Sequence, residues 1–273
     1  MEQFKDIYSV IEIAKKAGQE IFKTFLQLAT SNYKVDIKYK TDNSPVTAAD
    51  ILANKIICSE LKKLTPDIPI LSEEESNIPF VFRKKWRRYW LIDPLDGTGE
   101  FINHSPEFTV NIALIEKNQP ILGVSYIPAE KVCYFGYRSQ GAFKEDSNHL
   151  IRRIYVHKTN KNQIRVGISK YLGIQGLENF LSALANYELV YLGSSLKLCR
   201  LAEGLIDVYP RLNANFEWDV AAGQCILEEA GGIIADMNFQ SLKYNNKESL
   251  TVSPFIAFGD KDFLWKKYLR YLR

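Results

Sequence analysis

The feature that most constrains this chain is an apolar run, residues 90–98, that stops abruptly in two carboxylates, a glycine and a hydroxyl. Residues 89–92 are aromatic and β-branched, which is typical of a buried strand. Pro94 favours an extended Asp93 and has no N–H for a strand ladder, so we expect the strand to end at Asp93. Asp96 follows three residues later, and both carboxylates can therefore face one point.

This corner has the composition of a magnesium site. Gly97 lets the backbone approach a bound group closely, and carboxylate oxygens suit a hard cation such as Mg²⁺. A calcium loop is a poor alternative, because it needs acids at alternate positions. Phosphatases that form an aspartyl phosphate carry a similar Asp-x-Asp-Gly-Thr motif and are a second alternative. In this chain the position of their nucleophile is occupied by Pro94, which cannot attack phosphorus. A plain turn between two strands stays open as the third alternative.

Composition restricts the class of protein. The chain has 273 residues, enough for two subdomains, and 46% of them are hydrophobic, as in ordinary globular proteins. A net charge of +3 is too small to indicate a nucleic-acid partner. The cysteines are scattered, which favours reduced thiols in a cytosolic protein. No run is long enough to span a bilayer, and the N-terminus has no uninterrupted apolar region, so we expect neither a membrane span nor export.

The first lobe is expected at residues 1–150. Apolar spacings of three and four over residues 4–28 predict a long amphipathic helix, and a second helix begins after Thr47. Thr47 stands three residues before Asp50 in a capping-box pattern, so Asp50 is either a capping acid worth about 1 kcal/mol or a catalytic group. Glu73 follows a short strand, and its position at a strand end makes it a candidate to meet Asp93. Residues 108–137 alternate as in an antiparallel meander.

The second lobe is expected at residues 151–273, after a polar passage at 147–153. A strand at residues 190–192 leads through Gly193 to a helix start whose free N–H groups could hold an anion. Asp219 opens a further helix, where its charge suits the helix dipole. Residues 261–273 are basic and aromatic and predict an amphipathic helix packed on the body, with contact to an anionic membrane surface as the alternative.

These pieces together resemble the inositol monophosphatase superfamily of metal-dependent, lithium-sensitive phosphatases. Within it, four motifs in the same order resemble the bacterial 3'(2'),5'-bisphosphate nucleotidases, and the match covers nearly the whole chain. The motifs are residues 40–50, 71–74, 108–114 and 193–197, beside the corner at 93–98 and the Trp218-Asp219 pair. The resemblance implies an α/β fold, a layered α/β/α/β/α sandwich of two lobes with the metal site between them.

The resemblance also implies the metal ligands. Two or three Mg²⁺ ions would be held by the side chains of Glu73, Asp93, Asp96 and Asp219 and by the main-chain carbonyl of Leu95. Four carboxylates within about 5 Å repel by roughly 3 kcal/mol per pair at an effective dielectric constant of about 20. Six such pairs exceed the stability of a whole domain, about 5 to 15 kcal/mol. Only cations or protons can hold the four together.

Catalytic and substrate roles follow from the same resemblance. Thr98 and Asp50 would orient and deprotonate the attacking water, with Glu74 in support. Ser194, Lys197 and Arg211 would bind the nucleotide and its second phosphate, because a guanidinium and an ammonium suit a phosphate that does not react. The full set of expected substrate contacts is Glu73, Leu95, Gly97, Thr98, Ser194, Lys197, Arg211 and Asp219. One departure is Gly99, where close relatives usually have lysine.

The expected activity is Mg²⁺-dependent removal of the 3'-phosphate from adenosine 3',5'-bisphosphate, a by-product of sulfate assimilation, leaving AMP. The enzyme is expected in the cytoplasm, with peripheral association with the inner membrane as an alternative. One rival function is that of an inositol monophosphatase or another small sugar phosphatase with the same metal site. A second rival function is that of a catalytically weak nucleotide-binding protein, because Gly99 replaces the lysine that close relatives usually have.

Overall fold

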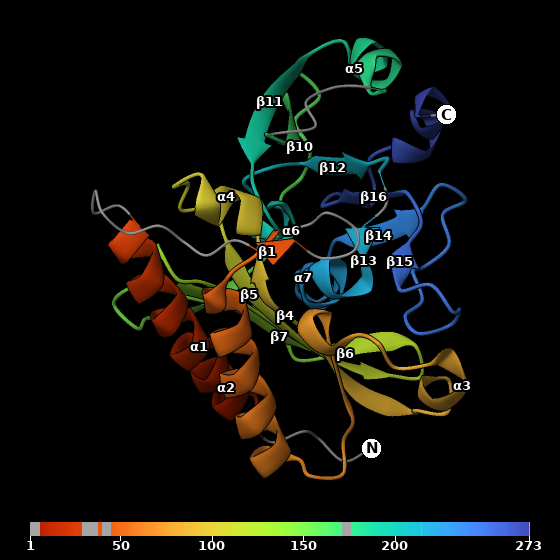
Figure 1. The fold of residues 1–273 in the computed structure, drawn as a ribbon. Helices are drawn as coiled ribbons and strands as arrows, with labels where there is room; N and C mark the ends of the chain where they lie inside the picture. The colour runs from red at the N-terminus through yellow and green to blue at the C-terminus, as the bar shows by residue number, and fades with distance from the viewer. Residues whose placement is uncertain (1–5, 29–37, 40–44, 171–175, 214, 273) are drawn as a thin grey trace.

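The computed structural model describes residues 6–28, 38–39, 45–170, 176–213 and 215–272 (Figure 1). The motif residues 40–44 lie outside this part of the chain. Helices α1 (Ile7–Leu28) and α2 (Ala48–Leu64) pack together and cover one face of a large sheet. The predicted apolar face of α1 is buried, and the short strands β1 (Lys38–Tyr39) and β2 (Pro45–Val46) pair just before α2. The predicted capping box at Thr47 and Asp50 is confirmed.

The large sheet has seven strands in sequence order, and all neighbours are antiparallel except the first pair. The strands are β3 (Ile70–Ser72), β4 (Arg88–Asp96), β5 (Thr109–Glu116), β6 (Gln119–Ile127), β7 (Val132–Tyr137), β8 (Gly141–Glu145) and β9 (Ile151–Ile154). The predicted meander is confirmed. The polar passage predicted at 147–153 is wrong in its second half, because Ile151–Ile154 pairs with β8 as the sheet edge. Three of its four residues are exposed, which hides the alternation typical of a strand.

The prediction that strand β4 ends at Asp93 is wrong, because the strand continues to Asp96. Asp93 pairs with Asn111 and Asp96 pairs with Thr109, so β4 carries one extra residue between two pairs of the ladder. Such a bulge accommodates Pro94, which has no N–H to donate, and it bends the strand locally. The bulge places Asp93 and Asp96 on one short, irregular stretch.

A second sheet has five strands in the order β11-β10-β12-β16-β14. These are β10 (Ile164–Ser169), β11 (Tyr187–Leu192), β12 (Val208–Arg211), β14 (Ile233–Asp236) and β16 (Phe255–Phe258), and a small pair is formed by β13 (Asn215–Phe216) and β15 (Thr251–Val252). Helices α6 (Leu196–Ala202) and α7 (Glu217–Glu229) lie between the two sheets, and α5 (Glu178–Leu184) covers the far face of the second (Figure 1). The layered α/β/α/β/α architecture is therefore confirmed.

One buried cluster joins the two sheets through α6 and α7, from Leu71 and Tyr89 to Phe255 and Ala257. The first sheet ends at Ile154 and the second begins at Ile164. The lobe boundary at residue 150 stays a prediction. Among the helices that the structure describes, none is long and apolar enough to cross a membrane.

The predicted C-terminal helix over 261–273 is wrong. The described part of this segment forms two short 3₁₀ turns, η2 (Trp265–Lys267) and η3 (Leu269–Tyr271). Trp265, Leu269 and Leu272 are buried against the second sheet, so packing on the body is confirmed. The Trp265 indole donates to the Asp260 carbonyl at 2.9 Å. Packing of large aromatic side chains holds this segment, and their spacing of three and four imitates helical periodicity.

Candidate metal centre and substrate cavity

Three carboxylates from separate elements converge between the layers. Glu73 comes from the 3₁₀ turn η1 (Glu73–Glu75) after β3, Asp93 from the bulge of β4, and Asp219 from the first turn of α7. Each offers an oxygen, and these oxygens all lie within 4.8 Å of one another. Because β3 and β4 are parallel, their carboxyl ends meet at one edge, as the sequence predicts for Glu73.

Burial and mutual repulsion make this cluster electrostatically unstable without a counter-charge. Asp93 is 1% exposed. Its pKa is raised well above its usual value, first by burial and then by Glu73, Asp96 and Asp219. The pKa of Asp219 is raised well above its usual value too, by burial and then by Asp96 and Glu73. Three clustered carboxylates, Asp93 buried and Glu73 and Asp219 partly buried, offer hard oxygen donors that fit a divalent cation, which would remove this penalty.

Asp96 occupies a different position from the other three acids. Its Oδ2 accepts hydrogen bonds from the backbone N–H and the hydroxyl of Ser195, both at 2.5 Å. Burial raises the pKa of Asp96, and the Ser195 bonds, Lys197 and Arg211 work against that rise. Ser195 Oγ also lies 2.8 Å from the main-chain oxygen of Asp219. Ser195 therefore joins two predicted ligands that come from different layers.

Asp50 and Thr98 meet, although they are 48 positions apart. Asp50 Oδ2 accepts from the backbone and the hydroxyl of Thr47 at 2.7 and 2.6 Å, while Oδ1 accepts from Thr98 Oγ1 at 3.1 Å. Asp50 is therefore a capping acid and a partner of Thr98 at once. Burial raises its pKa, against the hydrogen bonds from Thr47, and Glu74 adds to the rise. Thr98 Oγ1 also lies 3.2 Å from the Leu95 carbonyl, the predicted main-chain ligand.

Gly97 is needed at the corner for two reasons. It has a φ of +91°, and a Cβ there would lie 3.0 Å from the Glu107 carbonyl and 3.1 Å from Ser194 Cβ. It caps the short helix α4 (Thr98–Ile102). Glycine at this position therefore lets the corner pack closely against Glu107 and Ser194, and the predicted approach to a bound group stays a prediction.

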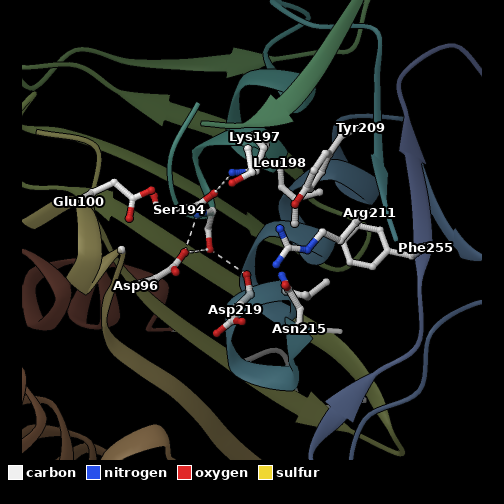
Figure 2. Close-up of a pocket in the computed structure, with 14 residues that line it drawn as sticks. Asp96, Glu100, Ser194, Lys197, Leu198, Tyr209, Arg211, Asn215, Asp219 and Phe255 are labelled. Atoms are coloured by element: carbon white, nitrogen blue, oxygen red, sulfur yellow. Dashed lines mark hydrogen bonds between the residues drawn. The ribbon is translucent and has the colours of Figure 1, made fainter. Parts of the chain in front are cut away.

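A cavity of about 320 Å³ adjoins Asp96 and Asp219 and is lined also by the predicted residues Gly97, Ser194, Lys197 and Arg211 (Figure 2). Figure 2 shows the Arg211 guanidinium pointing toward the two carboxylates. Within the described chain, Arg211 Nε and Ser194 Oγ are buried without a hydrogen-bond partner. Donors without partners on residues that line a polar cavity are typical of a site that completes its bonds with a ligand.

Lys197 differs from Arg211. It is 4% exposed, and its ammonium donates to the Leu192 and Ser194 carbonyls at 2.9 and 2.7 Å. Burial lowers its pKa to about 8. The structure thus places all three predicted phosphate ligands at the cavity, but Lys197 is already bonded to the backbone.

Sequence reasoning assigned no role to a buried polar chain behind Asp96. Ser125 Oγ donates to Asn111 Oδ1 at 2.8 Å, and Asn111 Nδ2 donates to Ser195 Oγ at 3.1 Å. Asn111 is a lone amide in the apolar strand β5, and such an interruption is the signal that could have identified it. Glu107, which accepts the Gly193 N–H at 2.7 Å, carries no comparable signal.

Comparison with known proteins gives one consistent result. The model of the inositol monophosphatase family matches residues 4–262. The 3'(2'),5'-bisphosphate nucleotidase CysQ of Aggregatibacter actinomycetemcomitans is 38% identical over 262 residues, covering 96% of this chain and 95% of that protein. CysQ of Escherichia coli (strain K12) is 41% identical over 240 residues, covering 88% of this chain and 94% of the relative.

Solved structures agree with the sequence relatives. The crystal structure of CysQ from Bacteroides thetaiotaomicron, described as a bacterial member of the same family, is 32% identical. It aligns with a TM-score of 0.76 and covers 92% of this chain and 96% of that one. The extragenic suppressor protein suhB of Bartonella henselae is 27% identical with a TM-score of 0.78, covering 98% of each chain.

Proposed function

The chain belongs to the inositol monophosphatase family as a 3'(2'),5'-bisphosphate nucleotidase, and we propose that its acidic cluster and cavity remove the 3'-phosphate of adenosine 3',5'-bisphosphate. The observation that carries this proposal is the junction at Asp96 and Asp219. Both line a cavity that also contains Arg211 and Ser194 with unused donors. The reacting phosphate would lie at the acidic cluster, and the second phosphate would accept hydrogen bonds from Arg211 and Ser194 in the cavity.

Membership of the family implies a divalent metal, and the acidic cluster supports it. We propose Mg²⁺, two or three ions, held by Glu73, Asp93, Asp96 and Asp219 with the Leu95 carbonyl. When bound, the ions supply the charge that activates a water near neutral pH and stabilises the leaving oxygen. For Asp96 to serve as a ligand, its second oxygen, Oδ1, must face the ions, since Ser195 occupies Oδ2.

The proton of the attacking water is proposed to pass to the Thr98–Asp50 pair. Thr98 Oγ1 donates to Asp50 Oδ1, so the lone pairs of its oxygen are available to orient a water. Burial raises the pKa of Asp50, which makes it a stronger general base. Glu74 is proposed to support this step through its charge beside Asp50. The Gly97 and Thr98 N–H groups are proposed to receive oxygens of the reacting phosphate.

Arg211 and Ser194 are proposed to bind the second phosphate. A guanidinium with an unused Nε can form a charged hydrogen bond to a phosphate oxygen, and Ser194 can add a neutral one. A cytoplasmic location is proposed as well, because all four cysteines are free thiols.

Phosphate release tests the function. Adenosine 3',5'-bisphosphate, inositol 1-phosphate and fructose 1,6-bisphosphate are assayed with and without Mg²⁺. We expect release to depend on Mg²⁺ and kcat/KM to be highest for the adenosine bisphosphate. A preference for inositol phosphate would assign the enzyme to the inositol phosphatases. Tight nucleotide binding without phosphate release would instead indicate a binding protein.

A further inference from the structure

The turn that carries Glu73 is short and has little support of its own. Residues Glu73–Glu75 form the single 3₁₀ turn η1, and all three side chains are acidic. Hydrogen bonds in 3₁₀ turns have poorer geometry than those in α-helices. The hydroxyl of Ser72, the N-cap residue, accepts the Glu74 N–H only at 3.4 Å. Contacts from outside the turn must therefore hold Glu73 in its place in the acidic cluster.

Asn54 supplies such contacts from α2. It is 3% exposed, and it lies one helical turn after Asp50 on the same face of α2. Its Oδ1 accepts the Ser72 hydroxyl at 2.7 Å, and its Nδ2 donates to Glu75 Oε1 at 2.8 Å. Ser72 immediately precedes η1, and Glu75 is its last residue. One buried amide therefore bonds to both ends of the turn.

We propose that Asn54 is a positioning residue for the metal centre: by bonding to Ser72 and Glu75 it fixes η1 against α2 and so holds Glu73 in the acidic cluster. The inference rests on the proposed function, because Glu73 is a proposed metal ligand. It accounts for a buried amide in the middle of a helix, where asparagine is an unfavourable residue. Asn54 acts through η1 and not on the substrate.

The same amide links η1 to the helix of the proposed base. Burial raises the pKa of Asp50, and the charge of Glu74 adds to that rise, so Glu74 lies close to Asp50. Glu74 stands between the two residues that Asn54 bonds. The Cys58 thiol, one turn further along α2, donates to Asn54 Oδ1 at 3.3 Å, so this oxygen accepts two hydrogen bonds. A change at Asn54 should therefore affect η1 before it affects the capping of α2.

Asn54→Ala tests the proposal through the metal. Mg²⁺ is titrated, and the midpoint is followed by the rise in melting temperature and, separately, by phosphate release. We expect the midpoint to rise about 10-fold in both measurements, the lower end of the range for removal of a group that orients a metal ligand. At saturating Mg²⁺, kcat should stay close to that of the wild type, because the bound ions then hold Glu73 themselves. An unchanged midpoint, with or without a loss of kcat, would overturn the proposal.

Ile57→Val is the matched control for stability. It removes one methyl group from a fully buried side chain of the same helix. It should lower the melting temperature of the metal-free protein and leave the Mg²⁺ midpoint unchanged. If it raised the midpoint as much as Asn54→Ala does, the effect would be a general loss of stability, and the positioning role would be refuted.

Reversing the hydrogen bond between Asn54 and Glu75 separates positioning from charge. Asn54→Asp sets two carboxylates against each other and should raise the midpoint, whereas added negative charge alone would attract Mg²⁺ and lower it. When Asn54→Asp is combined with Glu75→Gln, the glutamine amide can donate to the aspartate, and the net charge equals that of the wild type. This double variant should recover the wild-type midpoint. Glu75→Gln alone should change it little, because its amide oxygen still accepts from Asn54.

Failure of the positioning role and failure of the proposed function give different results. A double variant that is no better than Asn54→Asp, or failure of both to fold, would contradict the positioning role; if Asn54→Asp alone does not fold, the double variant is still expected to fold. A wild type that binds Mg²⁺ without hydrolysing adenosine 3',5'-bisphosphate would refute the proposed function, while the melting titrations would still decide the role of Asn54. A wild type whose melting temperature does not respond to Mg²⁺ would refute the metal centre and the role of Asn54 together.

Discussion

At the scale of single residues, Asp50 has hydrogen-bond partners for helix capping and for the proposed proton transfer. Its two oxygens have separate partners: Oδ2 caps α2 through Thr47, and Oδ1 accepts from Thr98. The sequence presented capping and catalysis as alternatives, yet the geometry allows both. The two roles respond differently to substitution, because capping affects folding whereas proton transfer affects turnover.

Asp50→Asn should therefore lower kcat by about 10²- to 10⁴-fold, the range of general base catalysis, with KM little changed. An amide retains a capping oxygen, so the free energy of unfolding should fall by at most about 1 kcal/mol. Steady-state kinetics and urea unfolding measure the two effects. Normal turnover in a variant that has lost this stability would show that Asp50 only caps its helix.

Gly99 lies in α4, beside Thr98, and a Cβ there would have no heavy atom within 4 Å among the described neighbours. Gly99→Lys should be accommodated without repacking, and it should stabilise the helix by about 0.5 to 1 kcal/mol because glycine disfavours helices. The added charge should lower KM for the bisphosphate, more strongly at low salt than at high salt. Gly99→Ala is the control for helix propensity. A KM unchanged by Gly99→Lys at low salt would show that this position does not face the substrate.

At the scale of elements, the site depends on where strands and helices end. Asp93 lies in the bulge of β4 and Asp219 lies in the first turn of α7. The two acids therefore meet only because these two elements pack together. Asp219 Oδ2 also accepts the Phe216 N–H at 3.1 Å and so fixes the start of its helix. The carboxylates are thus held by the backbone geometry of two layers.

Asp93→Asn or Asp219→Asn should nearly abolish activity at saturating Mg²⁺, because each removes a proposed ligand. Without Mg²⁺, Asp93→Asn should be as heat-stable as the wild type or more so, since a repulsive buried charge has gone. Activity assays and melting temperatures in the presence of a chelator measure both effects. Retention of most activity by either variant would remove that residue from the metal site.

At the scale of the whole molecule, the acidic cluster brings together Asp93 of the first sheet and Asp219 of α7, the helix between the two sheets. Asp93 and Asp219 have folded pKa values above the usual value of 3.8, first because they are buried. A carboxyl with a raised folded pKa binds its proton more tightly in the folded state. Folded stability is therefore lost as pH rises from the usual value up to the folded pKa.

The metal-free protein should consequently melt at lower temperature as pH rises from about 4 toward neutrality. Bound Mg²⁺ should abolish this decline, because the cation replaces the protons. Melting curves across this pH range, with Mg²⁺ and with a chelator, measure the difference. Asp93→Asn in chelator is the control and should show a shallower decline. A metal-free wild type whose melting temperature is constant over this range would show that the cluster is not under repulsion.

The sequence by itself determined the elements whose signals are local. The amphipathic α1, the capping box of α2, the meander and the Asp-Pro-Leu-Asp-Gly-Thr corner all follow from the spacing of neighbouring residues. The motifs in their order also determined the family. Only the tertiary structure decided the contacts between distant segments: the approach of Asp50 to Thr98, and the chain from Ser125 through Asn111 and Ser195 to Asp96. These contacts depend on burial and on exact backbone direction, and one side chain pattern is compatible with several such arrangements. The same limit explains the C-terminal segment, where a spacing of three and four records which residues are buried but not which backbone conformation buries them.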